Sequence, residues 1–150
     1  MRTRREPLPV IGWREWVALP DLGVEAIKVK VDTGARTSSL HAPGMEFFER
    51  EGEDWVRFVV HPQRDRSPEA VAVEAPIADR RAVRNSGGQE EMRPVIVTDV
   101  ELHGRRWPIE VTLTRRDSMG FRMLLGRQAI RKRFTVDPGV SFRAGRRPSR

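Results

Sequence analysis

Short runs in which apolar and polar residues alternate recur along this chain of 150 residues. The segment Ile27-Lys28-Val29-Lys30-Val31 shows the alternation most regularly. Because neighbouring side chains of a β-strand point to opposite faces, such a run predicts a strand with one buried and one exposed face. Strands of this kind are expected at residues 11–19, 25–31, 38–42, 55–60, 71–77, 80–84, 92–102 and 107–114.

Turn signals rich in glycine, proline and asparagine separate these runs. They lie at Pro20-Asp21-Leu22-Gly23, at Gly52, at Asn85-Ser86-Gly87-Gly88 and at His103-Gly104. The Gly52 turn predicts a hairpin between the acidic segment 46–53 and the strand that follows it. The turn at 85–88 predicts a second hairpin tip.

The end of the chain differs from the rest, because residues 127–133 have a helix-like pattern. Segments 134–137 and 140–142 then close the domain, and residues 62–68 and 115–120 are expected to be polar loops. The sequence therefore predicts an all-β, mainly antiparallel barrel with one short helix near its end.

Basic residues outnumber acidic ones by 28 to 21, for a formal net charge of +7, but they are unevenly placed. The terminal segments 1–9 and 143–150 hold seven arginines and one glutamate. Between them, residues 10–79 are acidic on balance and residues 80–133 are basic. We expect a flexible basic arm at 1–9, one domain at 10–142 and a disordered basic tail at 143–150. Since the tails supply most of the charge, a nucleic-acid partner is not expected.

Cysteine is absent, which excludes thiol catalysis and disulfides and suits a reducing compartment. The N-terminal residues are basic but no apolar stretch follows them, so they do not predict a signal peptide. No apolar run approaches the length of a membrane span. A cytoplasmic protein without a membrane partner is therefore expected.

Asp32-Thr33-Gly34-Ala35 carries the chemistry. It follows a predicted strand, so its carboxylate lies in a tight loop beside a hydroxyl and a glycine. Aspartic proteolysis needs two carboxylates that share a proton, and the chain has this motif once. An enzyme of this type would have to work as a homodimer, with one Asp32 from each copy.

A second motif lies downstream, where Leu124-Leu125-Gly126-Arg127 opens the predicted helix. The order of strand, Asp-Thr-Gly-Ala, glycine hairpin, two strands, apolar-apolar-Gly-Arg and helix resembles the retropepsin-like aspartic peptidases. The resemblance covers roughly residues 11–142. It implies the closed acid-protease barrel, peptide hydrolysis and no metal or other cofactor.

The segments 31–42 and 123–127 more closely resemble a bacterial family long labelled ATP-dependent zinc proteases. That resemblance implies a functional link to ATP-grasp ligases, which add glutamates to protein tails. It also implies acidic, glutamate-rich protein segments as substrates.

The resemblance assigns the candidate site. Asp32 is the catalytic acid, Thr33 bonds across the two-fold axis, and Gly34 lets the substrate backbone approach. Ala35 and the hairpin tip, with Ser86 and Gly87, would contact the substrate, the tip acting as a flap. Structural support would come from the downstream motif, with Leu124 and Leu125 packed beneath the catalytic loop, Gly126 at a tight crossing, and Arg127.

One position departs from the pattern of the viral retropepsins. In the viral enzymes an acidic residue follows Asp-Thr-Gly-Ala and pairs with the later arginine. This chain has Arg36 at that position, which leaves Arg127 without that partner. Arg36 suggests an acidic substrate side chain, and Arg84 and Arg93 beside the flap are expected to add to that preference. The alternatives are an ion pair in the core or dimer for Arg36, and a solvated strand face for the flap arginines.

Three other functions remain open on the sequence. The chain could bind acidic peptides on this fold without cleaving them, it could be a metal-dependent hydrolase as the family label says, or its basic tails at 1–9 and 143–150 could bind nucleic acid. His41, His61 and His103 are widely spaced and form no metal-binding helix motif.

Overall fold

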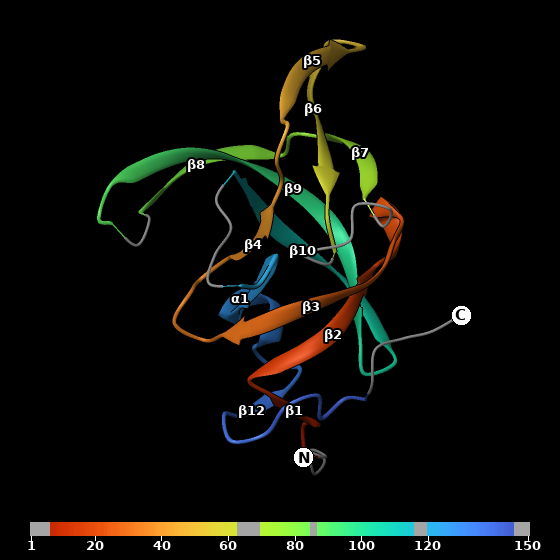
Figure 1. Ribbon diagram of the computed structural model, residues 1–150, viewed down its shortest axis with the longest axis vertical. Helices are drawn as coiled ribbons and strands as arrows, with labels where there is room; N and C mark the ends of the chain where they lie inside the picture. The colour runs from red at the N-terminus through yellow and green to blue at the C-terminus, as the bar shows by residue number, and fades with distance from the viewer. Residues whose placement is uncertain (1–6, 63–69, 85–86, 116–119, 146–150) are drawn as a thin grey trace, which may run out of the picture.

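Six strands close into a barrel in the computed structural model, which describes residues 7–62, 70–84, 87–115 and 120–145 (Figure 1). Around the ring the order is β10 (Arg105–Thr114), β4 (Ser38–His41), β11 (Met123–Gly126), β3 (Val24–Asp32), β2 (Arg14–Leu19) and β9 (Glu90–Leu102). Antiparallel pairing of β9 with β10 closes the ring. The predicted closed β barrel is confirmed.

Alternation along the strands separates core from surface. In β3, Val29 and Val31 are buried, whereas Lys28 and Lys30 are half-buried on the outer face. The barrel interior is filled by aliphatic side chains from all six strands, among them Val17, Ile27, Leu40, Ile96, Val111 and Leu125, each fully or almost fully buried. Burial of one such side chain stabilises a fold by about 1.5–3 kcal/mol.

Parallel pairings join strands that are far apart in sequence. β11 lies between β3, to which it is parallel, and β4, to which it is antiparallel. β10 pairs with β4 in parallel, and β1 (Val10–Gly12) pairs in parallel with β12 (Thr135–Asp137). These three parallel pairings were not predicted, because local alternation carries no information about which distant strand is the neighbour.

A smaller antiparallel sheet consists of β5 (Glu46–Arg50), β6 (Glu53–Val60) and β7 (Val71–Pro76). The predicted hairpin at Gly52 is confirmed, and its two strands extend away from the barrel (Figure 1). Val56, Phe58 and Val73 anchor this sheet to the barrel core, since all three are buried there.

A second hairpin is formed by β8 (Asp79–Arg84) and β9, paired from Asp79 opposite Val95 to Arg84 opposite Glu90. It confirms the predicted strands on both sides of the glycine-rich tip. Asn85 and Ser86 lie outside the described residues, as do parts of the predicted loops at 62–68 and 115–120.

Two predicted elements need correction. The first strand is interrupted at Trp13, and the predicted turn after it is a 3₁₀ turn, Pro20–Leu22. The helix α1 (Arg127–Ile130) ends earlier than predicted, because Arg131 is extended and Lys132 adopts a left-handed φ of 66°. Residues 140–142 form neither helix nor strand, and Phe142 has a positive φ of 53°.

The C-terminal segment is held more tightly than the predicted tail would be. The N–H groups of Arg143 and Ala144 donate to the Glu15 carboxylate, at 2.8 and 3.1 Å. The predicted tail is therefore structured at residues 143–145, and residues 146–150 lie outside the described part. No helix among the described residues is long and apolar enough to span a membrane.

Candidate active site

Asp32 is the last residue of β3, where the barrel strand gives way to a tight loop. Its side chain is half-buried, and Oδ1 accepts a hydrogen bond from the Gly34 N–H at 3.0 Å. The Ala35 N–H donates to the Asp32 carbonyl at 3.2 Å. A side chain on Gly34 would place Cβ 3.3 Å from Oδ1, so glycine permits this close turn. The loop therefore fixes the carboxylate while leaving it partly open to solvent.

The start of α1 holds the loop from below. The Arg127 N–H donates to the Ala35 carbonyl at 2.8 Å, and the Gln128 N–H donates to the Arg36 carbonyl at 3.1 Å. The Arg127 guanidinium donates from Nη1 to the Gly34 carbonyl at 3.0 Å. Arg127 thus has a backbone oxygen of the Asp32 loop as its partner, in place of a carboxylate.

The crossing at Gly126 leaves no room for a side chain. A Cβ there would lie 2.8 Å from the Thr37 carbonyl oxygen and 2.6 Å from its carbon. The Gly126 N–H donates to Ser38 Oγ at 3.0 Å, which ties β11 to β4. The leucines of this motif separate, because Leu125 is buried in the core and Leu124 is half-buried on the outer face. Leu125 packs in the core as expected for a supporting residue, and packing of Leu124 beneath the loop stays a prediction.

The flap hairpin presents different charges on its two faces. Register places Arg81 opposite Arg93 and Val83 opposite Glu91 on one face. Arg81 donates from both Nη atoms to Glu110 of β10, at 2.8 and 3.0 Å. Arg93 Nε donates to Glu91 at 2.8 Å, and Thr114 Oγ1 donates to the same carboxylate oxygen at 3.3 Å. This face is therefore the one turned toward β10.

The ion pairs with arginine lower the pKa values of the acidic side chains beside them. Hydrogen bonding to Arg81 is the main cause that lowers the pKa of Glu110 below its ordinary value, and the charge of Arg36 contributes a little. Arg81 also lowers the pKa of Asp79, with help from the Arg80 N–H. The inward charges of the flap are thus compensated within the protein.

Of the two arginines expected beside the flap, only Arg93 faces β10. Arg84 stands opposite Glu90 on the other face of the hairpin and is exposed. Arg84 shares a face with its partner Glu90, and Glu90 is three positions from Arg93 along β9. Because side chains alternate between the two faces of a strand, Arg84 and Arg93 point to opposite faces and do not form one substrate-facing group. Gly87 is exposed near the tip, and Ser86 is outside the described residues.

Arg36 differs from the flap arginines. Its backbone is fixed by Gln128, its side chain is exposed, and it has no ion pair with any residue in the described part of the chain. A cation placed four residues after Asp32 is therefore available to a ligand. Thr33 is also exposed, and its hydroxyl has no hydrogen bond within the described residues.

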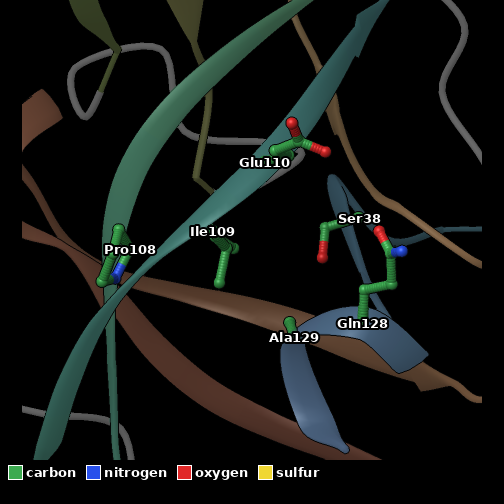
Figure 2. Close-up of a pocket in the computed structure, with 6 residues that line it drawn as sticks. All are labelled: Ser38, Pro108, Ile109, Glu110, Gln128 and Ala129. Atoms are coloured by element: carbon green, nitrogen blue, oxygen red, sulfur yellow. The ribbon is translucent and has the colours of Figure 1, made fainter.

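A pocket of about 180 Å³ lies between β4, β10 and α1 (Figure 2). The side chains of Ser38, Glu110 and Gln128 surround it in Figure 2, and Asp32 is not among its lining residues. Glu110 connects this pocket to the flap through Arg81.

Three cations on the Asp32 face were missed by the sequence reasoning, which looked for basic residues near the flap. Lys28 and Lys30 lie on the same outer face of β3 as Asp32, and Arg14 of β2 is opposite Lys30. The alternation that predicted the strand already contained this placement, because residues two and four positions apart share a face.

Comparison with known proteins then decides the family. Residues 10–147 match the model of a family described as RimB-like, retropepsin-like aspartic endopeptidase RimB. The chain belongs to this family. The description names an aspartic endopeptidase and does not carry the zinc-protease label implied by the sequence resemblance.

Curated relatives are longer proteins. One from Shewanella pealeana, named probable alpha-L-glutamate ligase, is 49% identical over 136 residues. Proteins with the same name from Desulfotalea psychrophila and Parasynechococcus marenigrum are 47% and 49% identical. The alignments cover 91% of this chain and about 30% of each relative.

A solved structure has the same fold. The crystal structure of a Legionella pneumophila protein of unknown function superposes with a TM-score of 0.76 at 28% identity. The match covers 91% of this chain and 98% of that protein, so the two share their architecture over almost their whole lengths.

Proposed function

We propose that this family member is a homodimeric aspartic endopeptidase in which each copy supplies one Asp32. The observation that carries the proposal is the Asp32 loop. Backbone hydrogen bonds from Gly34, Ala35, Arg127 and Gln128 fix its path, while the single carboxylate remains half-open. A preorganised loop of this kind is what general acid–base catalysis requires of its carboxylate.

The chemistry would need both copies. Two carboxylates about 3 Å apart cannot both ionise, so the pair holds one proton. The ionised carboxylate removes a proton from water, and the water oxygen bonds to the peptide carbonyl carbon. The protonated carboxyl gives its proton to the carbonyl oxygen. The carboxyl that took the proton from water then gives it to the nitrogen, while the other carboxylate takes a proton from a hydroxyl of the tetrahedral intermediate. The C–N bond breaks, the amine leaves, and both carboxyls are back in their starting state.

Neighbouring groups suit such a dimer. The Thr33 hydroxyl has no partner among the described residues of its own chain, so it is free to bond to the second loop. Gly34 and Ala35 offer backbone groups beside the carboxylate. The β8–β9 hairpin, which extends from the barrel in Figure 1, would cover a bound peptide and exclude water.

Glutamate-rich protein segments are the proposed substrates. The unpaired Arg36 beside the loop supports an acidic side chain near the scissile bond. The similarity to part of proteins named glutamate ligases supports a cytoplasmic link to an ATP-grasp ligase that makes such segments. Binding of these substrates requires no metal or cofactor in this proposal.

The test is incubation of a glutamate-tailed peptide with wild type and with Asp32→Asn, followed by mass spectrometry. We expect cleavage by wild type and a loss of about 10⁴-fold or more in the variant. Glu49→Gln is the matched control, because Glu49 is exposed and its side chain has no hydrogen bond or ion pair in the described part of the chain.

Mixing the two proteins extends the test to the dimer. If one Asp32 from each copy is needed, unfolding and refolding a mixture with excess Asp32→Asn should remove more activity than dilution alone. Activity that survives Asp32→Asn but is lost in chelator would support a metal hydrolase instead. Tight peptide binding by a wild type that never cleaves would support a non-catalytic binder.

A further inference from the structure

Cations lie in a row beside Asp32 on the outer face of the barrel. Lys28, Lys30 and Asp32 alternate with the buried Val29 and Val31, so all three point outward from β3. In β2, Arg14 stands opposite Lys30, and on the other side of β3, Leu124 of β11 stands beside Lys30. The row therefore adjoins the carboxylate proposed to be catalytic.

Lys28, Lys30 and Arg14 form no ion pair with a carboxylate within the described residues. Arg14 Nε donates to Ser141 Oγ at 3.1 Å, and its guanidinium carbon lies 4.8 Å from the Trp13 ring centroid. The Lys28 ammonium lies 5.6 Å from the Phe121 ring. Contacts with aromatic rings hold a cation in place without supplying an opposite charge that would neutralise it.

Spacing connects the row to a bound peptide. Residues two apart along a strand are separated by about 6.6 Å, which is one step from Asp32 to Lys30 and a second step to Lys28. An extended peptide repeats its side chains on one side at the same step. A peptide that runs along the outer face of β3 with its scissile bond at Asp32 would bring its nearby side chains within reach of the long Lys30 and Arg14 side chains.

We propose that Lys30 and Arg14, extended by Lys28, form the subsite that binds carboxylate side chains of the substrate beside the scissile bond. Its role in cleavage rests on the proposed function, whereas its binding of acidic peptide does not. The flap arginines are less suited to binding substrate carboxylates, because Arg81 and Arg93 are already paired with Glu110 and Glu91. A single-stranded nucleic acid is the competing anionic ligand, and the experiment below compares the two directly.

The experiment measures binding in the Asp32→Asn background, where the peptide cannot be cut by the dyad. The probes are a fluorescent glutamate-rich peptide, its glutamine counterpart and a single-stranded oligonucleotide of similar charge. We expect Lys30→Gln to weaken glutamate-peptide binding about tenfold and to leave the weak glutamine-peptide binding unchanged. Arg131→Gln, which removes an exposed charge with no side-chain partner among the described residues, should change neither.

Charge reversal makes the test independent of any general loss of fold. Lys30→Glu should reject the glutamate peptide and favour a lysine-rich peptide, with an unchanged melting temperature. Lys30 is the lead position because Arg14 also contacts the C-terminal segment.

Three results would overturn the subsite: equal losses for Lys30→Gln and Arg131→Gln, unchanged glutamate-peptide binding in Lys30→Gln, or tighter binding of the oligonucleotide than of the peptide. Failure of the peptidase itself would appear separately, as a wild type that binds the glutamate peptide through Lys30 and does not cleave it.

Discussion

The flap stalk (the paired part of the flap hairpin, residues 79–84 and 90–95) and the outer face of β3 both carry several charges, and they differ in whether a residue of opposite charge pairs with them. On the stalk, Arg81 and Arg93 each have a carboxylate within 2.8 Å. On the β3 face, Lys28 and Lys30 have none among the described residues. The difference shows that a count of arginines near a site does not say which of them a ligand can use.

The stalk charges have a structural consequence instead. Arg81 joins β8 to Glu110 of β10, and Glu91 joins β9 to Thr114 at the end of β10. These contacts set where the flap leaves the barrel. We therefore expect changes on the stalk to affect stability and flap position, and changes on the β3 face to affect the binding of acidic peptide.

Glu15 is a buried carboxylate that backbone N–H groups satisfy, and its loss should give the largest effect on stability. It is fully buried on the inner side of β2 and accepts hydrogen bonds from the N–H groups of Gly12, Arg143 and Ala144. Glu15→Ala would leave one buried and two part-buried N–H donors without their acceptor, so the free energy of unfolding should fall by about 3 kcal/mol. Urea denaturation of the variant measures this loss.

The control for Glu15 is Glu49→Ala, which removes an exposed carboxylate and should change the free energy of unfolding by less than about 0.5 kcal/mol. Equal stability of the two variants would mean that the buried carboxylate does not hold the C-terminal segment.

Arg81→Gln should have a smaller effect that depends on pH. Arg81 lowers the pKa of Glu110 and Asp79, so its contribution is present above the ordinary pKa of these acids and is lost as pH falls through their lowered values. Because the partners are partly exposed, we expect a loss of at most about 1 kcal/mol at neutral pH. Thermal melts of both proteins across the acidic range measure the difference.

The melting temperatures of the two proteins should converge at low pH, where the carboxylates are protonated in both proteins. A constant difference between them at every pH would show that Arg81 acts through packing and not through these ion pairs.

Arg93→Gln should have the smallest effect on ligand binding. Glu91 already occupies the Arg93 guanidinium, so we expect the affinity for a glutamate-rich peptide to change less than about threefold. Fluorescence anisotropy in the Asp32→Asn background allows direct comparison with Lys30→Gln. If Arg93→Gln weakened binding as much as Lys30→Gln does, the contrast between the two regions would be wrong.

Much of the fold could be predicted because alternation and turn chemistry are local. The strand at 25–31 and the hairpin at Gly52 follow from the identities of neighbouring residues, whereas closure of the barrel was implied by the family resemblance. The helix predicted at 127–133 is too long. Lys132 adopts a left-handed backbone conformation, which the presence of a lysine does not predict. The candidate site was predicted as a motif, but Arg84 and Arg93 were grouped although the hairpin turns them to opposite faces.

The sequence by itself determined the strands, the placement of Lys28, Lys30 and Asp32 on one face, and the single Asp-Thr-Gly-Ala loop. Only the tertiary structure decided that β11 lies between β3 and β4, that Arg127 holds the Gly34 carbonyl, and which charges have partners. The physical reason is range. Side-chain periodicity depends on the two dihedral angles of each residue, whereas the neutralisation of a charge depends on which remote strand the closing barrel brings beside it.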